Sequence, residues 1–178
     1  IRRAVDLLLT IFPFETAFLD RHGVAAHYVG HPLANDMPLQ PDRDGARGRI
    51  GLAPGRPTLA ILPGSRRGEV GRIARPFLET AAALRAEMPD LQVVAPLVNQ
   101  ATRELFEQQR AACAPGLPVT VLLRDTATAL AAADVALVAS GTATLEGLLS
   151  KRPMVVGYRV SAATWHIARW LRLLKVDH

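Results

Sequence analysis

From Thr58 onward, short and continuously apolar segments alternate with segments of helical pattern, and this alternation limits the folds that the chain can adopt. The apolar segments are TLAILP, LQVVAPL, VTVLL, DVALVA and MVVGY. The predicted helices cover residues 69–87 and 102–112 and begin again at Thr126, Thr142 and Ala162. Strands that are apolar throughout are typical of a parallel sheet covered on both faces. We therefore predict a Rossmann-like α/β fold, a doubly wound parallel sheet with helices on both faces.

The residues before Thr58 divide into two parts. Residues 1–36 contain an apolar run, VDLLLTIF, then a helical stretch to Arg21 and a strand-like segment, AAHYVGHP, as at the end of another α/β domain. Residues 37–57 hold four prolines and four glycines among charged residues, which predicts a linker with one short helix around residues 43–52. Residues 58–178 are then an incomplete nucleotide-binding domain. The chain begins without methionine, so we expect it to be part of a longer protein.

Composition favours a cytoplasmic protein with a sizeable core. Hydrophobic residues make up 49% of the 178 residues, but no run of 18 apolar residues indicates a membrane span. The only cysteine, Cys113, lies in an apolar segment and fits a reducing compartment. No His, Cys and Asp cluster has metal-ligand spacing, so neither a metal nor another cofactor is expected.

The net charge of +5 is confined to the C-terminal part of the chain. Residues 151–178 carry six basic side chains and one acidic side chain, whereas residues 1–150 carry 15 of each. In SAATWHIARWLRLLKV, helical periodicity places Ile167, Trp170 and Leu174 on one face and Arg169 and Arg172 on the opposite half. This pattern predicts peripheral contact with an anionic membrane surface. A solvated basic face is the alternative, and no motif indicates nucleic-acid binding.

Two junctions between a strand and a helix carry the residues most suited to chemistry. The first is PGSR, in ILPGSRRGEV, where Gly64 permits close approach of the backbone and Ser65 and Arg66 offer donors to an anion. Arg67 is expected to be solvated, because consecutive side chains of a helical turn point in different directions and cannot both reach the same anion. Helix N-termini attract phosphates, so this junction predicts a phosphate site.

The second junction, SGTATLE, presents small hydroxyl residues, backbone N–H groups and one acid. Its members are Ser140, Gly141, Thr142, Ala143, Thr144 and Glu146. Ser140 or Thr142 can cap the following helix, and Glu146 can accept hydrogen bonds from the hydroxyls of a sugar. Phosphate and ribose together indicate a nucleotide. Simple helix capping, with Glu146 paired to Lys151 or Arg152, is the alternative interpretation.

Several segments in order resemble the lipid-A-disaccharide synthase family of inverting glycosyltransferases with two Rossmann-like domains. They are VDLLLTIFPFE, AHYVGHPLAND, ILPGSRRGEV, VVAPLVN, LVASGTATLE and MVVGYRVSAATWHIAR. The resemblance implies transfer of diacylglucosamine from a UDP-linked donor to 2,3-diacylglucosamine 1-phosphate, with release of UDP. It also implies that residues 1–36 end the acceptor domain and that the rest belongs to the donor half of a GT-B fold.

The resemblance assigns PGSR and SGTATLE to the donor site. Arg66 would stabilise the diphosphate as UDP leaves, helped by Ser65 and the N–H groups near Gly64. The acid that the family is thought to use as catalytic base would precede Ile1, so this chain alone is expected to be inactive. A UDP-sugar 2-epimerase and a noncatalytic nucleotide-binding module remain alternatives, because a fold does not identify a substrate. Asn99 and Asp134 are predicted to be turn or capping residues.

Overall fold

A computed structural model describes residues 4–160 and Trp170. Its contacts divide the chain into two compact units, Ile1–Pro41 and Asp42–His178. This division falls inside the predicted linker, and the short helix expected there is present as α3 (Arg43–Arg49). The assignment of the units to acceptor and donor domains stays a prediction.

The first unit is a small β-α-β arrangement followed by a short helix. Its elements are β1 (Leu8–Thr10), α1 (Pro13–Arg21), β2 (Ala26–Tyr28) and α2 (Pro32–Asp36). The two strands pair in parallel, with Leu8 opposite Ala26. Each helix begins with a proline. Proline is favourable there because N–H groups in the first turn have no acceptor within the helix. The sequence pattern had indicated this α/β connection.

The second unit is built on five parallel strands in the order β5-β4-β3-β6-β7. After α3, its elements are β3 (Thr58–Leu62), α4 (Arg67–Glu87), β4 (Gln92–Leu97), α5 (Gln100–Cys113), β5 (Thr120–Leu123), α6 (Thr126–Ala132), β6 (Val135–Ala139), α7 (Thr142–Leu149) and β7 (Met154–Gly157). The helix predicted to begin at Ala162 lies outside the described residues, except for Trp170. All the other predicted elements of this unit are present.

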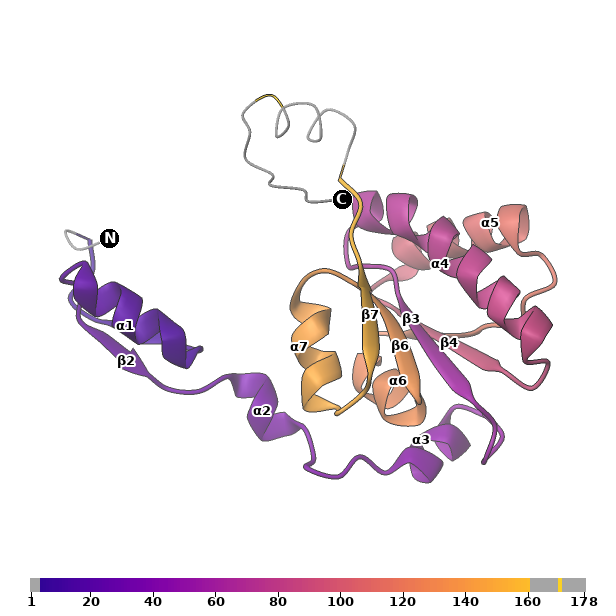
Figure 1. Ribbon diagram of the computed structural model, residues 1–178, viewed down its shortest axis with the longest axis horizontal. Coiled ribbons are helices and arrows are strands. Elements are labelled where there is room, and N and C mark those ends of the chain that lie inside the picture. The colour runs from indigo at the N-terminus through magenta and orange to yellow at the C-terminus, as the bar shows by residue number, and fades with distance from the viewer. Residues whose placement is uncertain (1–3, 161–169, 171–178) are drawn as a thin grey trace. The chain divides into compact units, whose positions relative to one another are not determined.

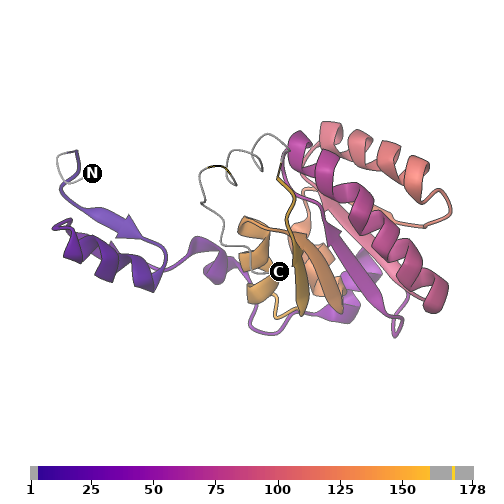
Figure 2. The same ribbon diagram turned by 45° about the horizontal axis from the view of Figure 1, so that its top comes forward.

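Helices cover both faces of this sheet (Figures 1 and 2). On one face, Ile61 and Val93 pack with Phe77 of α4 and Phe106 of α5. On the other face, residues of α3 and α6 pack against the alternate side chains of the same strands, among them Ala60 and Val94. Central strands therefore bury both of their faces, and β3 is buried along its whole length. The predicted α/β fold class is confirmed.

An ion pair holds α3 against the start of the sheet. Arg47 is 3% exposed, and its guanidinium donates to the Ala132 carbonyl oxygen at 2.9 Å and to Asp134 Oδ2 at 2.8 Å. Asp134 also accepts the Thr58 N–H at 2.9 Å and pairs with Arg43 at 2.9 Å. Asp134 is thus a tertiary ion-pair residue instead of the predicted cap, because its partners are distant in sequence.

Two other capping predictions have different outcomes. Asn99 is the N-cap of α5, and its side chain accepts the Thr102 N–H at 2.9 Å, as predicted. At α7 the N-cap is Gly141, and no side chain caps the helix, so the expectation for Ser140 or Thr142 is wrong. Gly141 has φ 154°, and its backbone turns the chain into the helix without a side-chain acceptor.

The membrane-related predictions rest mostly on residues that the structure does not describe. Within residues 4–160 and at Trp170, no helix combines the length and the apolar character that crossing a bilayer requires. The amphipathic helix predicted for residues 161–176, with its basic face, falls outside the described residues, apart from Trp170 of its predicted apolar face, which is exposed.

Candidate functional site

The strand order places the two predicted motifs side by side. From β3 the chain proceeds outward through β4 to β5, then returns across the sheet to β6 on the other side of β3. The loops after β3 and β6 therefore diverge to opposite faces of the sheet. Ligands of doubly wound sheets bind in the crevice at such a switch point, outside the carboxyl ends of the strands. PGSR follows β3 and SGTATLE follows β6, so both motifs border this crevice.

A cavity of about 450 Å³ occupies this position. All of the predicted donor-site residues except Thr144 line it, and they come from both motifs: Gly64, Ser65, Arg66, Ser140, Gly141, Thr142, Ala143 and Glu146. Thr144 instead donates its hydroxyl proton to the Gly141 carbonyl oxygen at 2.6 Å. The structure thus brings together residues about 75 positions apart in sequence, as the strand neighbours require.

The PGSR turn depends on a glycine and on an acid that the sequence analysis did not single out. Gly64 has φ 108°, in the region that side chains disfavour, and a Cβ atom there would lie 2.7 Å from Glu69 Oε2. Glu69 Oε2 accepts the N–H groups of Ser65 at 3.0 Å and Arg66 at 3.2 Å. Its Oε1 accepts from Arg66 Nη1 at 3.2 Å. Any anion that binds at this turn competes with the Glu69 carboxylate for these donors.

The environment of Glu69 favours its charged form. Partial burial by itself would raise the pKa of the carboxyl. The hydrogen bonds from the Arg66 and Ser65 N–H groups, together with the charges of Arg66 and Arg72, nevertheless hold this pKa below its ordinary value. An acid three residues after the N-cap is a known signal of a capping box, and that signal was present in the sequence.

Glu146 lies in the opposite electrostatic situation. It is half-buried on α7 and lines the cavity, and desolvation raises the pKa of its carboxyl. No ion pair joins it to Lys151 or Arg152. Arg152 donates instead to the Leu130 and Ala131 carbonyl oxygens. The simple surface pairing considered for Glu146 is therefore wrong, and its carboxylate is available to hydroxyl donors in the cavity.

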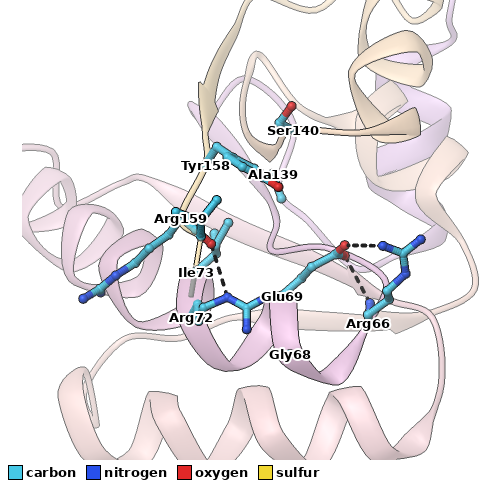
Figure 3. A pocket seen from close by; sticks show the side chains of 10 residues that line it. Arg66, Gly68, Glu69, Arg72, Ile73, Ala139, Ser140, Tyr158 and Arg159 are labelled. Atoms are coloured by element: carbon cyan, nitrogen blue, oxygen red, sulfur yellow. Dashed lines mark hydrogen bonds and ion pairs between the residues drawn. The ribbon is translucent and has the colours of Figure 1, made fainter. Parts of the chain in front are cut away.

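A second cavity of about 380 Å³ adjoins the first, and Figure 3 shows its lining. The two cavities share Arg66, Glu69, Ala139, Ser140 and Tyr158. Tyr158, which follows β7, and Arg72 of α4 were not predicted as site residues. No short motif marks them, because the sheet order alone brings the end of β7 beside the start of α4.

The residues that the structure describes include no group of three or more His, Cys, Asp or Glu side chains placed to hold a metal ion. The charged residues that line both cavities are Arg66 and Glu69, and Arg72 lines the second cavity alone. The arginine side chains and the N-termini of α4 and α7 supply positive potential there.

A family model for lipid-A-disaccharide synthetase matches residues 1–178. The chain belongs to the lipid-A-disaccharide synthase family. A lipid-A-disaccharide synthase of Pseudomonas aeruginosa is 52% identical over 175 residues, which are 98% of this chain and 46% of that protein. One from Escherichia coli is 48% identical over 178 residues, which are 100% of this chain and 46% of that protein. The chain thus spans about half the length of these lipid-A-disaccharide synthases.

A solved structure supports the fold by shape. The crystal structure of a GtfA/B complex superposes with a TM-score of 0.50 at 14% identity, over 90% of this chain and 32% of that chain. At this identity the likeness concerns the fold alone. The family match confirms the resemblance to lipid-A-disaccharide synthases over the full chain, while the roles of individual cavity residues stay predictions.

Proposed function

We propose that the complete protein makes the disaccharide of lipid A and that this chain contributes the donor site. The donor would be UDP-2,3-diacylglucosamine and the acceptor 2,3-diacylglucosamine 1-phosphate. The observation that carries the proposal is the cavity at the switch point, which joins the PGSR turn and the SGTATLE helix in a chain of this family. Phosphate fits the first motif, and the ribose hydroxyls fit Glu146 of the second.

In the proposed reaction, the 6-hydroxyl oxygen of the acceptor attacks the anomeric carbon of the donor sugar. The bond from that carbon to the phosphate oxygen breaks, and UDP leaves with the bonding electrons. Attack from the face opposite UDP inverts the centre and gives the β-1,6 linkage. The proton of the hydroxyl passes to a base that we assign to no residue of this chain.

Arg66 is the residue proposed to stabilise the departing diphosphate. Its side chain is 84% exposed, lines both cavities and is paired with Glu69. A cation aimed at charge that develops during bond breaking lowers the barrier, because its interaction is stronger in the transition state than in the ground state. Binding of the diphosphate would exchange the Glu69 carboxylate for phosphate oxygens.

The complete enzyme tests this proposal. Arg66→Ala should lower turnover roughly a hundredfold, as loss of one well-placed charged donor does. Arg67→Ala is the matched control, because Arg67 is exposed and lines neither cavity. Mass spectrometry would follow the disaccharide and UDP from the two acylated substrates. Disaccharide formation at the wild-type rate by folded Arg66→Ala protein would remove Arg66 from the mechanism.

The same assay separates the proposed reaction from other nucleotide chemistry. A noncatalytic module would bind UDP and form no product, and a 2-epimerase would convert the donor without any acceptor. We also propose that the acylated substrates place the enzyme at the cytoplasmic face of the inner membrane, with its basic C-terminal part against anionic headgroups. The excess of positive charge in residues 151–178 supports this location.

A further inference from the structure

The donor site needs more positive charge than Arg66 supplies. A sugar-linked diphosphate carries about two negative charges, and more charge develops as UDP leaves. Arg66 is already balanced by Glu69, to which it is paired at 3.2 Å. The adjacent arginine in the sequence, Arg67, is exposed and lines neither cavity. A further cation beside this turn would add to the positive potential that the helix N-termini supply.

Arg72 is positioned to supply this charge. It lies on α4 one turn after Gly68, is partly buried, and lines the cavity that adjoins the donor cavity. Side chains of a helix point toward its N-terminus and cover the residue four positions earlier. The guanidinium of Arg72 accordingly lies over Gly68, where an added Cβ atom would be 3.3 Å from Nη1. Glycine at position 68 leaves this space open.

The guanidinium is fixed at one end and available at the other. Arg72 Nε donates to the Arg159 carbonyl oxygen at 3.2 Å, which ties α4 to the segment after β7 (Figure 3). Among the described residues, the two Nη atoms of Arg72 have no hydrogen-bond acceptor. The side chain of Arg159 extends away from Glu69 in the same view.

We propose that Arg72 is a second phosphate-binding residue of the donor site, with its Nη groups donating to the diphosphate of the UDP-sugar. The shared lining at Arg66 and Glu69 makes the two cavities adjacent, so one diphosphate can contact both arginines. This proposal rests on the proposed function. Arg67, next to Arg66 in the sequence, was expected to be solvated, whereas Arg72, six residues from Arg66, was not singled out by the sequence.

The test compares UDP with uridine on the complete enzyme by calorimetry and ligand-detected NMR. Arg72→Ala should weaken UDP binding about tenfold, the usual loss for a charge-assisted hydrogen bond, and leave uridine affinity unchanged. Arg67→Ala should stay within about twofold of wild type for both ligands. A merely structural role of Arg72 would weaken both ligands alike, because uridine uses the same cavity without the phosphates.

Two substitutions by residues with longer side chains than alanine keep the test decisive if Arg72→Ala does not fold. Arg72→Lys retains the positive charge and Arg72→Gln removes it. The Arg72→Lys enzyme should therefore bind UDP several-fold more tightly than the Arg72→Gln enzyme. Equal UDP affinity of these two variants, or a KM increase for the acceptor phosphate with UDP affinity unchanged, would overturn the proposal. Failure of the wild-type enzyme to bind UDP would instead overturn the proposed function, and with it this assignment.

Discussion

Glu69 and Glu146 show how neighbouring groups give the same side chain two different chemical states. Glu69 receives two backbone N–H groups and an arginine, so the pKa of its carboxyl is held below the ordinary value despite partial burial. Glu146 is desolvated on the wall of the cavity, which raises the pKa of its carboxyl. The first acid accepts from the donors that an anion would use, and the second has no ion-pair partner within the part of the chain that the structure describes.

The raised pKa of Glu146 predicts a pH dependence that can be measured with uridine, which has no titrating phosphate. Ribose hydroxyls donate to the ionised carboxylate, so uridine affinity should fall on acidification at a pH above 4.5, the ordinary glutamate value. Glu146→Gln should lower uridine affinity about tenfold at neutral pH and remove this dependence. A wild-type affinity that is constant down to the ordinary pKa would contradict the prediction.

Glu146 should affect folding stability and uridine affinity in opposite directions as pH rises. A carboxyl whose pKa is raised in the folded state keeps a proton that the unfolded chain has already released. Its contribution to stability is therefore lost as pH rises from the ordinary pKa through the folded pKa. Glu146→Gln should thus raise the thermal midpoint at neutral pH while it weakens binding. A substitution that merely disturbed the structure would lower both quantities.

At the scale of elements, α3 shows how a short helix inside a predicted linker becomes part of the nucleotide-binding unit. The helix has seven residues and would be marginal alone. Asp42 caps it by accepting the Gly45 N–H at 2.9 Å, and Ala46 is fully buried against the core on the α6 side. Arg47 then connects it to Ala132 and Asp134. Tertiary contacts therefore add to the local cap and hold α3 against the sheet.

Removing the buried partner of this connection should be costly. Arg47→Met should lower the free energy of unfolding by about 3 kcal/mol, because it leaves part of the Asp134 carboxylate and the Ala132 carbonyl oxygen without their donor. Arg43→Ala should cost less than about 1 kcal/mol, since Arg43 is 47% exposed. Calorimetry would measure the unfolding of both variants. The transition that UDP stabilises is assigned to this unit. Equal shifts for the two variants would show that burial of Arg47 adds nothing.

At the scale of the whole molecule, the charge distribution separates a balanced body from a basic end. Residues 1–150 are neutral overall, and residues 151–178 carry the whole excess of +5. Each cation near an anionic bilayer contributes about 1 kcal/mol of attraction, which salt screens. The basic end is thus the part of this chain best suited to the proposed contact with an anionic membrane surface.

Charge reversal tests this surface assignment. Arg169→Glu with Arg172→Glu should reduce sedimentation of the complete enzyme with anionic vesicles roughly tenfold at low salt, and less at moderate salt. The matched control reverses Arg49 and Arg103, two exposed arginines of the balanced part, and changes the net charge equally. Equal losses in the two double variants would mean that net charge, and not the basic end, governs membrane binding.

The sequence by itself determined the fold class, the positions of most elements and the two motifs of the candidate site. These features are local: continuous apolar runs mark covered strands, and glycine with small polar residues marks the junctions before helices. Gly64 could be singled out because glycine permits close approach of the backbone to a ligand, and the structure adds that its φ of 108° favours glycine. The roles of Ser65, Arg66 and Glu146 were likewise suggested by side-chain chemistry at known places in a strand-helix repeat.

Only the tertiary structure decided which of these residues meet. The order β5-β4-β3-β6-β7 makes β3 and β6 neighbours, and pairing between strands distant in sequence has no local signature. The fold also showed that Glu69 accepts hydrogen bonds from the donors of the turn. It showed that the Arg72 side chain lies over Gly68, whereas Arg67 is exposed. Closeness in sequence does not decide whether a charged side chain faces the site. The position of the residue on its helix and the order of the strands in the sheet decide it.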